Sequence, residues 1–233
     1  MARAAAIADN GHMTLNLFPD EPVVEPREQA IAPGATLLRG AALAQAVALL
    51  DAVETVIRQS PLRHMITPGG FRMSVAMTNC GAAGWITDRS GYRYGAQDPL
   101  SGRAWPEMPA VFATLATQAA ARAGFADFVP DACLINQYEP GSRMSLHQDK
   151  NESDCRFPYG APIVSVSLGL PAVFLFGGER RADKTQRVPL VHGDVVVWGG
   201  PARLRFHGVM PLEDGEHPLL GRRRINLTFR RAL

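Results

Sequence analysis

The stretch "PDACLINQYEPGSRMSLHQDK" (residues 130–150) marks the point at which the chain changes character. Upstream, Ala-rich segments show helical spacing, whereas from here on short apolar runs are separated by turn residues. The later runs are "PIVSVSLGL" (162–170), "AVFLFGG" (172–178), "RVPLVHGDVVVWGG" (187–200), "RLRFHGV" (203–209) and "RRRINLTFR" (222–230). Such a series is typical of a β-sandwich or barrel, and the lack of alternating helices argues against a doubly wound sheet. The sequence therefore predicts an all-β core from residue 130 onward.

Two helices are predicted before this core. The first lies within residues 40–60, and its apolar stripe at helical spacing consists of Leu43, Val47, Leu50 and Ile57. The second lies within residues 108–124 and ends at Gly124, a residue type that favours helix C-termini. Between them, residues 62–105 are rich in Gly and Pro and predict hairpins and loops. We expect a partly disordered N-terminal arm (1–30) and a single domain (31–233), in which residues 31–129 cover a core formed by residues 130–233.

The composition is that of a globular protein that works in a reducing compartment. The chain has 233 residues, of which 46% are hydrophobic and 20% charged. No apolar run approaches the roughly 20 residues that span a membrane, and no export signal is evident. The cysteines, Cys80, Cys133 and Cys155, are odd in number and widely spaced, so they predict neither a disulfide framework nor a zinc site. We expect a cytoplasmic protein.

The basic residues are unevenly divided between the two types. Only Lys150 and Lys184 are lysines among 24 basic residues, while the net charge is only +2. A GC-rich genome would produce this bias without any functional cause. Alternatively, arginine suits the bidentate binding of carboxylate and phosphate groups. Only the positions of the arginines separate these two interpretations.

A pair of possible metal ligands ends the opening stretch. His147 and Asp149 are two positions apart, so they point to the same side of an extended segment. With a second histidine they would form the facial triad of non-haem Fe(II) oxygenases, which leaves positions open for a co-substrate and O2. The candidates for the third ligand are His12, His64, His192, His207 and His217. Several strands separate Asp149 from His207, enough for the two segments to meet across a barrel. In "RLRFHGV", Arg203, Arg205 and His207 are expected to share a face.

A second His-x-Asp pair, His192 and Asp194, rivals the first. Gly193 lies between its members and an apolar run follows. This pattern favours a turn that enters a buried strand.

The last run, "RRRINLTFR", carries a polar face and an apolar face. Ile225, Leu227 and Phe229 alternate with polar residues, namely Arg224, Asn226, Thr228 and Arg230. In "ACLINQYEP" (132–140), Asn136 and Tyr138 likewise share one face. A surface strand would look the same. If both polar faces turn into a barrel, however, they form a pocket for a dicarboxylate.

These stretches together resemble the AlkB family of Fe(II)/2-oxoglutarate dioxygenases. The resemblance covers nearly the whole chain from about residue 14. It rests on "SPLRHMITPGGFRMSVAMTNCGAAGW" (60–85), residues 130–150, "APIVSVSLGLPAVF" (161–174), "HGDVVVWGG" (192–200) and "RINLTFR" (224–230). It implies a mainly β fold with flanking helices: a double-stranded β-helix, or jelly roll, with a nucleotide-recognition lid in the N-terminal part (31–129).

The resemblance also implies roles for individual residues. His147, Asp149 and His207 match the iron ligands, whereas His192 and Asp194 match a turn that binds no metal. The residues that match the 2-oxoglutarate site are Asn136, Tyr138, Arg224, Asn226 and Arg230. Those that match the surroundings of the alkylated base are Met77, Trp85, Tyr92, Arg93, Tyr94, Asn151 and Arg181. From the sequence alone, Trp85 and Tyr92 could equally be ordinary core aromatics.

Two departures from the family pattern affect the substrate. Asn151 stands where the best-known bacterial relative has an Asp that contacts the exocyclic amine of the base. Asn accepts a hydrogen bond through its carbonyl but carries no negative charge, which leaves the preferred base open. The loop near residues 155–160 is longer by about four residues by the same resemblance, and we interpret it as a surface insertion.

The implied activity is the oxidative dealkylation of N-alkylated bases such as 1-methyladenine and 3-methylcytosine. Fe(II), 2-oxoglutarate and O2 would hydroxylate the alkyl group, with release of aldehyde, succinate and CO2. The expected partner is single-stranded or flipped-base DNA, with RNA as a second candidate. We expect a monomer with no membrane contact and no obligate protein partner. Two rivals remain: a dioxygenase of protein side chains or small molecules, and a non-catalytic nucleic-acid binder with a vestigial metal site.

Overall fold

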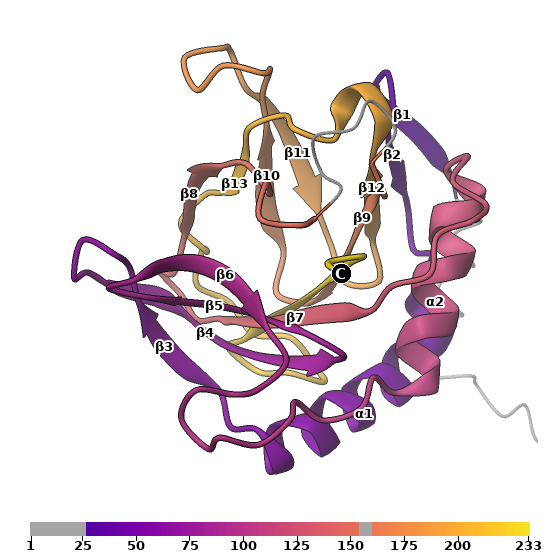
Figure 1. The fold of residues 1–233 in the computed structure, drawn as a ribbon. Helices are drawn as coiled ribbons and strands as arrows, with labels where there is room; N and C mark the ends of the chain where they lie inside the picture. Colours follow the sequence, from indigo (N-terminus) through magenta and orange to yellow (C-terminus); the bar gives the residue numbers. More distant parts are fainter. Residues whose placement is uncertain (1–26, 154–159) are drawn as a thin grey trace, which may run out of the picture.

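The computed structural model of the chain describes residues 27–153 and 160–233 (Figure 1). Most of the predicted arm, His12, Cys155 and nearly all of the longer loop lie outside these residues. The last predicted arm residues, 28–30, begin a strand rather than a disordered segment. Within the described residues, no helix is long and apolar enough to cross a membrane.

Two antiparallel sheets form the core, which confirms the predicted fold class. The eight-stranded sheet has the order β1-β2-β12-β9-β14-β7-β4-β3. Its strands are β1 (Glu28–Ala32), β2 (Ala35–Leu38), β3 (Arg63–Ile66), β4 (Arg72–Gly81), β7 (Ala132–Tyr138), β9 (Ile163–Gly169), β12 (Val195–Trp198) and β14 (Arg224–Arg230). The four-stranded sheet has the order β11-β10-β13-β8, with β8 (Met144–His147), β10 (Ala172–Phe176), β11 (Gln186–Leu190) and β13 (His207–Val209). One apolar cluster joins the two sheets, with Leu134 and Trp198 from the larger and Phe174 from the smaller.

Two helices cover the outer face of the larger sheet (Figure 1). They are α1 (Ala46–Gln59), preceded by the short 3-10 helix η1 (Leu43–Gln45), and α2 (Ala110–Arg122). Their places agree with the sequence, and Gly124 follows α2 with a φ of +90°. A second short 3-10 helix, η2 (Gly200–Ala202), follows β12.

The predicted apolar stripe of the first helix is only half correct. Leu50 and Ile57 are partly buried and pack against the core beneath the helices, as expected. The buried side chains of α1 are those of Ala46, Leu49, Val53 and Val56. Val47 is 62% exposed, and Leu43 precedes the helix and is 44% exposed. Because α1 is apolar over much of its circumference, more than one stripe satisfies helical spacing, and the packing against the sheet decides which one is buried.

The polar residues of β14 face the interior of the fold and not the solvent. Every residue of this strand is buried. Ile225, Leu227 and Phe229 belong to the apolar cluster beneath the helices, and the alternate side chains point to the opposite face. In the register with β7, Arg224 stands opposite Tyr138 and Asn226 opposite Asn136. The alternative of a half-polar surface strand is therefore wrong.

A two-stranded ribbon lies at the open end of the two sheets. It consists of β5 (Gly84–Asp88) and β6 (Gly91–Gly95), and it follows directly from β4 (Figure 1). The indole Nε1 of Trp105 donates to the carbonyl of Gly95 at 2.9 Å. A Cβ at Gly84 would lie 2.4 Å from the indole of Trp105, so only glycine permits this close packing. Strands β1 to β4 precede residue 130 but belong to the larger sheet. This sheet therefore contains strands from both sides of the predicted boundary near residue 130.

Candidate metal and substrate site

Three side chains at the mouth of the sheets converge as a possible metal site. The ligand atoms of His147, Asp149 and His207 all lie within 4.8 Å of one another. Nε2 of His147 is 3.7 Å from Oδ1 of Asp149, and Nε2 of His207 is 3.8 Å from its Oδ2. The two histidines are register partners on β8 and β13. Among the described histidines, His207 is therefore the one that completes the triad.

The imidazole rings are oriented for metal binding. Nδ1 of His147 lies 2.9 Å from the carbonyl of Ser145, and Nδ1 of His207 lies 2.9 Å from the carbonyl of Arg205. A carbonyl can only accept, so each Nδ1 carries the proton and each Nε2 keeps a free lone pair. Burial, helped by the nearby His147, lowers the pKa of His207 to about 3. Neutral His207 is the form that binds a metal ion.

Asp149 is ionised although it is almost completely buried. Burial by itself would raise the pKa of this carboxyl group, but Arg230 and then the two histidines hold the pKa well below its usual range. Both Nε and Nη2 of Arg230 donate to Oδ2 of Asp149, at 3.0 and 2.7 Å. Two imidazoles and one carboxylate are a ligand set that suits a divalent transition metal such as Fe(II).

A small cavity of about 60 Å³ lies behind this triad, between the two sheets. Its lining includes every residue predicted for 2-oxoglutarate, namely Asn136, Tyr138, Arg224, Asn226 and Arg230. Nη2 of Arg224 donates to the Ser167 hydroxyl at 2.7 Å. Within the described residues, Nε and Nη1 of this buried guanidinium have no hydrogen-bond partner, nor does Oδ1 of Asn136. Unpaired buried donors on a cation are costly, and a carboxylate at either edge of this guanidinium would accept from one of them.

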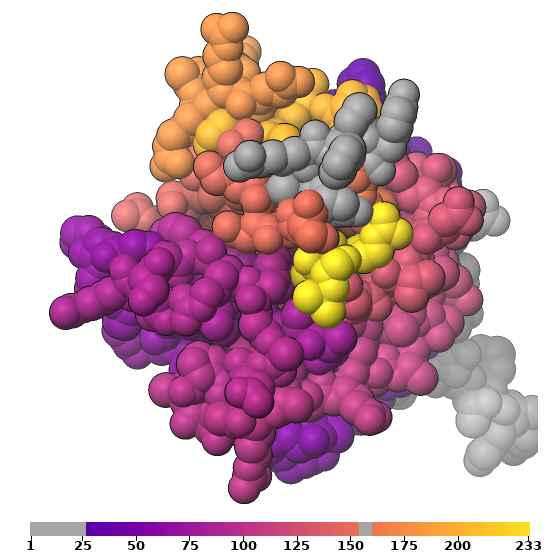
Figure 2. All heavy atoms as spheres, viewed as in Figure 1, coloured from indigo at the N-terminus to yellow at the C-terminus, as the bar shows by residue number. Residues whose placement is uncertain are grey.

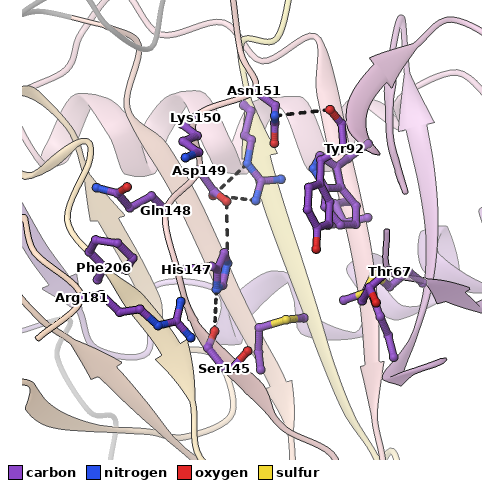
Figure 3. A pocket seen from close by; sticks show the side chains of 16 residues that line it. Thr67, Tyr92, Ser145, His147, Gln148, Asp149, Lys150, Asn151, Arg181 and Phe206 are labelled. Carbon is purple, nitrogen blue, oxygen red and sulfur yellow. Dashed lines mark hydrogen bonds and ion pairs between the residues drawn. The ribbon is translucent and has the colours of Figure 1, made fainter. Parts of the chain in front are cut away.

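A larger cavity of about 470 Å³ opens on the other side of the triad (Figure 3). Tyr92 faces His147 and Asp149 across it. Trp85 stacks on Tyr92 with ring centroids 5.6 Å apart, and Met77 forms part of the wall. The volume falls in the range of small-molecule pockets, about 300–1,000 Å³. Because His147, Asp149 and Arg230 line both cavities, the two spaces meet at the triad.

Trp85 is fixed by a residue that the sequence did not single out. Nδ2 of Asn79 donates to the Trp85 carbonyl, and the Trp85 N–H donates to Oδ1 of Asn79, both at 3.0 Å. Asn79 itself is buried on β4. The aromatic wall therefore has a defined position relative to the larger sheet.

The other predicted substrate residues divide into two groups. Asn151 and Arg181 line the large cavity, and Nη1 of Arg181 donates to the carbonyl of Leu146 at 2.6 Å. Arg93 and Tyr94 do not line it. Arg93 pairs with Asp88 at 2.7 Å on the exposed side of the ribbon, and the Tyr94 hydroxyl donates to Oε1 of Glu152 at 2.7 Å.

Glu152 and Arg203 are buried charged residues whose pairing the sequence did not predict. The carboxylate of Glu152 and the guanidinium of Arg203 are 2.9 Å apart. The predicted shared face of Arg203, Arg205 and His207 is wrong, because residues 203 and 204 form a turn and β13 begins only at His207. No periodicity marks a charged residue outside a helix or strand, so Glu152 gave no signal and Arg203 was misplaced.

The second His-x-Asp pair has a structural role, as the sequence predicted. Asp194 accepts hydrogen bonds from Nη1 of Arg39 at 2.7 Å and from the N–H of Gly40 at 3.0 Å. Gly193 has a φ of +84°, which fits a turn. Nδ1 of His192 accepts from the N–H of Gly169 at 3.0 Å. Both side chains hold loops together and lie outside the triad.

Comparisons with known proteins identify the family. Residues 34–230 match the 2OG-Fe(II) oxygenase superfamily. The chain is 58% identical to the alpha-ketoglutarate-dependent dioxygenase AlkB of Salmonella typhimurium over 94% of this chain and 98% of that protein. It is 55% identical to the AlkB of Escherichia coli with the same coverage. A more distant relative, the mouse nucleic acid dioxygenase ALKBH1, is 32% identical over 57% of this chain and 33% of that protein. The solved structure of OsALKBH1 superposes with a TM-score of 0.75 at 30% identity, over 88% of this chain and 99% of the other.

Proposed function

This chain belongs to the 2OG-Fe(II) oxygenase superfamily, and we propose that His147, Asp149 and His207 hold its Fe(II). It is an AlkB-type 2-oxoglutarate-dependent dioxygenase, an oxidoreductase that removes alkyl groups from nucleic-acid bases. When bound, Fe(II) with 2-oxoglutarate and O2 supplies the hydroxylation of the alkyl carbon, and the products are the repaired base, an aldehyde, succinate and CO2. The protein's own residues bind and orient the substrates and exclude water from the site.

The small cavity is the proposed site of 2-oxoglutarate. Arg224 has free N–H donors at Nε and Nη1, and one of these edges would pair with one carboxylate of 2-oxoglutarate. Arg230 lies next to the triad and would pair with the other carboxylate. Tyr138, whose ring lies beneath the Arg224 guanidinium at 4.9 Å, completes the pocket. This pairing of buried cations with a dicarboxylate supports the assignment more than residue type alone.

The large cavity is the proposed site of the alkylated base. The observation that carries this proposal is its two unlike walls, the triad on one side and the stacked Trp85 and Tyr92 on the other. A base stacked on an aromatic ring gains roughly 1–3 kcal/mol, and the alkyl group on its pairing edge would then face the triad. Such an edge is hidden in a duplex, so we propose single-stranded or flipped-out DNA as substrate, with RNA as a second candidate.

The preferred lesions are proposed to be 1-methyladenine and 3-methylcytosine. A dioxygenase of protein side chains has no evident use for a stacked aromatic pair opposite the triad. A non-catalytic binder has no use for two imidazole nitrogens that converge with one carboxylate as a possible metal site. We further propose that the protein acts in the cytoplasm as a monomer without an obligate partner, which light scattering of the purified protein tests for oligomeric state.

One assay tests the main proposal. The protein is incubated with Fe(II), 2-oxoglutarate and an oligonucleotide that contains 1-methyladenine or 3-methylcytosine, and the bases and succinate are measured by mass spectrometry. We expect loss of the methyl group with matching succinate, and no loss with His147→Ala. Absence of demethylation by the wild-type protein would refute the substrate, and turnover by the variant would refute the ligand assignment.

A further inference from the structure

Glu152 joins the lid ribbon to the metal site through a single buried carboxylate. It lies three residues after Asp149 and is 5% exposed. Its Oε1 accepts a hydrogen bond from the Tyr94 hydroxyl at 2.7 Å, and its Oε2 accepts one from Nη2 of Arg203 at 2.9 Å. Figure 2 shows the ribbon (magenta) packed against the segment that carries Glu152 (salmon). Each carboxylate oxygen thus serves a different part of the fold.

Arg203 fixes the position of Glu152 relative to the metal ligand. Its Nη1 donates to the backbone carbonyl of Asp149 at 2.7 Å, and its Nε donates to the carbonyl of Ala161 at 2.8 Å. The guanidinium is buried and planar, so its three bonds hold the backbone of Asp149 and the side chain of Glu152 in one arrangement. Oε1 is thereby presented at a fixed point beside the triad.

The same oxygen also lies close to Arg230. Nε of Arg230 is 3.4 Å from Oε1 of Glu152, and both Nε and Nη2 are bonded to Asp149. Two buried carboxylates therefore balance two buried guanidiniums. Oε1 is shared between a phenol of the ribbon and the cation that lines both cavities.

On the ribbon side, Tyr94 is directly coupled to the aromatic wall. It is the register partner of Trp85 across β5 and β6, and it is two residues from Tyr92. The contacts of the ribbon with Asn79 and Trp105 hold it to the side of β4. Toward the triad, the other described hydrogen bond runs from Asn151 to the Tyr92 carbonyl and is 3.4 Å long. The hydrogen bond from Tyr94 to Glu152 is shorter than this one, and its acceptor is a carboxylate and not a backbone carbonyl.

We propose that Tyr94 and Glu152 are positioning residues whose hydrogen bond latches the ribbon over the triad and sets the space into which the base fits. A 2-oxoglutarate carboxylate beside Arg230 takes up part of the arginine's charge and weakens its hold on Oε1. Tyr94 then becomes the main partner of this oxygen, so 2-oxoglutarate tightens the latch. The coupling is reciprocal, because a bound base that holds the ribbon closed must raise the affinity for 2-oxoglutarate by the same factor. This inference rests on the proposed function.

Tyr94→Phe removes the hydroxyl and keeps the ring. Binding is measured by fluorescence anisotropy with a 3-methylcytosine oligonucleotide and its unmodified counterpart, using protein loaded with Mn(II) and 2-oxoglutarate. Loss of one hydrogen bond to a charged group is expected to raise the Kd of the methylated oligonucleotide about tenfold. The Kd of the unmodified oligonucleotide is expected to stay within about twofold. Asp88→Asn, which removes an exposed ion pair from the same ribbon, is the matched control and should leave both values unchanged.

Hydrogen exchange gives a second measurement that needs no nucleic acid. In the wild-type protein with Mn(II), 2-oxoglutarate should slow the exchange of the β5 and β6 amides several-fold, and this response should be absent in Tyr94→Phe. The latch is overturned if 2-oxoglutarate does not change the exchange rates of the wild-type protein. It is also overturned if 2-oxoglutarate slows exchange equally in Tyr94→Phe. An equal rise in both Kd values also overturns it, since Tyr94 would then contact the strand itself. If the wild-type protein binds both oligonucleotides alike, the proposed substrate fails, while the exchange measurement still decides on the latch.

Discussion

The two walls of the large cavity are built in different ways. On the sheet side, Asp149, His207 and Arg230 are buried, and each side chain is held by hydrogen bonds to charged or backbone groups. On the ribbon side, Tyr92 is 47% exposed and stacks on Trp85 at the edge of the fold. The chemistry is thus placed on a rigid support and the recognition of the base on a less protected one. Substitutions on the sheet side should therefore abolish function, whereas those on the ribbon side should reduce it in steps.

The largest effect is expected from His207→Ala. This change removes a triad ligand from the interior, where no other described side chain can replace it. Dealkylation should fall to background in the methyl-release assay at saturating Fe(II), while circular dichroism shows an intact β fold. Measurable turnover at high metal concentration would mean that the sheet side tolerates loss of a ligand. The two walls would then not differ in how strongly substitutions affect activity.

Arg224→Met should have the next largest effect, on 2-oxoglutarate alone. Hydrogen bonds to charged groups contribute about 1.5–3 kcal/mol, so the KM for 2-oxoglutarate should rise roughly 10- to 100-fold. The KM for the oligonucleotide should change little, because Arg224 lines only the small cavity.

Thermal unfolding of the same Arg224→Met variant gives its control. The arginine carries unpaired buried donors, so the free energy of unfolding without 2-oxoglutarate should be unchanged or higher. A large loss of stability would instead make Arg224 a structural residue.

These sheet-side residues are also those that the sequence predicted best. Strands place alternate residues on one face, so the polar positions of "RINLTFR" could be assigned to one face from the sequence. That this face lines a pocket and is not a surface needed the structure. His147 and Asp149 are close in sequence and needed no tertiary information. His207 was only one of several candidates, because the pairing of β8 with β13 depends on the whole fold.

The ribbon side and its connections were predicted less well, for physical reasons. Glu152 and Arg203 lie outside helices and strands, where no repeat marks a buried charge. Both partners of Glu152, Tyr94 and Arg203, are distant from it in sequence. The stripe of α1 was only half correct, because a helix that is apolar on several sides leaves the choice of buried face to tertiary packing. Local patterns therefore identify the chemistry, whereas contacts between segments determine how the base is held.

Trp85→Ala tests the ribbon side directly. It removes the stacking surface, which contributes roughly 1–3 kcal/mol to base binding. The KM for a 3-methylcytosine oligonucleotide should rise by about tenfold or more, while the KM for 2-oxoglutarate stays unchanged. Trp85→Phe keeps a ring and should restore part of the affinity. Equal changes in both KM values would show that Trp85 itself, and not only the Tyr94 bond, is coupled to the 2-oxoglutarate site.

Lowering the pH should decrease the free energy of unfolding through His207 on the sheet side. The pKa of His207 is lowered to about 3 in the folded protein from an ordinary value of 6.5, because burial disfavours the charged ring. Between these values the unfolded chain binds the extra proton, so stability falls as the pH decreases. The loss is about 1.4 kcal/mol per pH unit from this group. Urea unfolding of the metal-free protein at several pH values should show a shallower slope for His207→Gln, and an identical slope would refute the assignment.

The smallest effect concerns Asn151, which lines the cavity where the two walls meet. Its amide donates to the Tyr92 carbonyl at 3.4 Å, and the cavity also presents Lys150, Arg181 and Arg230 against the single carboxylate of Asp149. A cationic base such as 3-methylcytosine therefore meets little negative charge, whereas neutral 3-methylthymine has no such disadvantage. Asn151→Asp adds a charge at an exposed position, where one ion pair contributes up to about 1 kcal/mol. The ratio of kcat/KM for 3-methylcytosine to that for 3-methylthymine should thus rise about three- to fivefold. Loss of the long bond to Tyr92 affects both bases equally and cancels in this ratio. An unchanged ratio would mean that the charge of the base is recognised elsewhere, on the sheet side or along the strand.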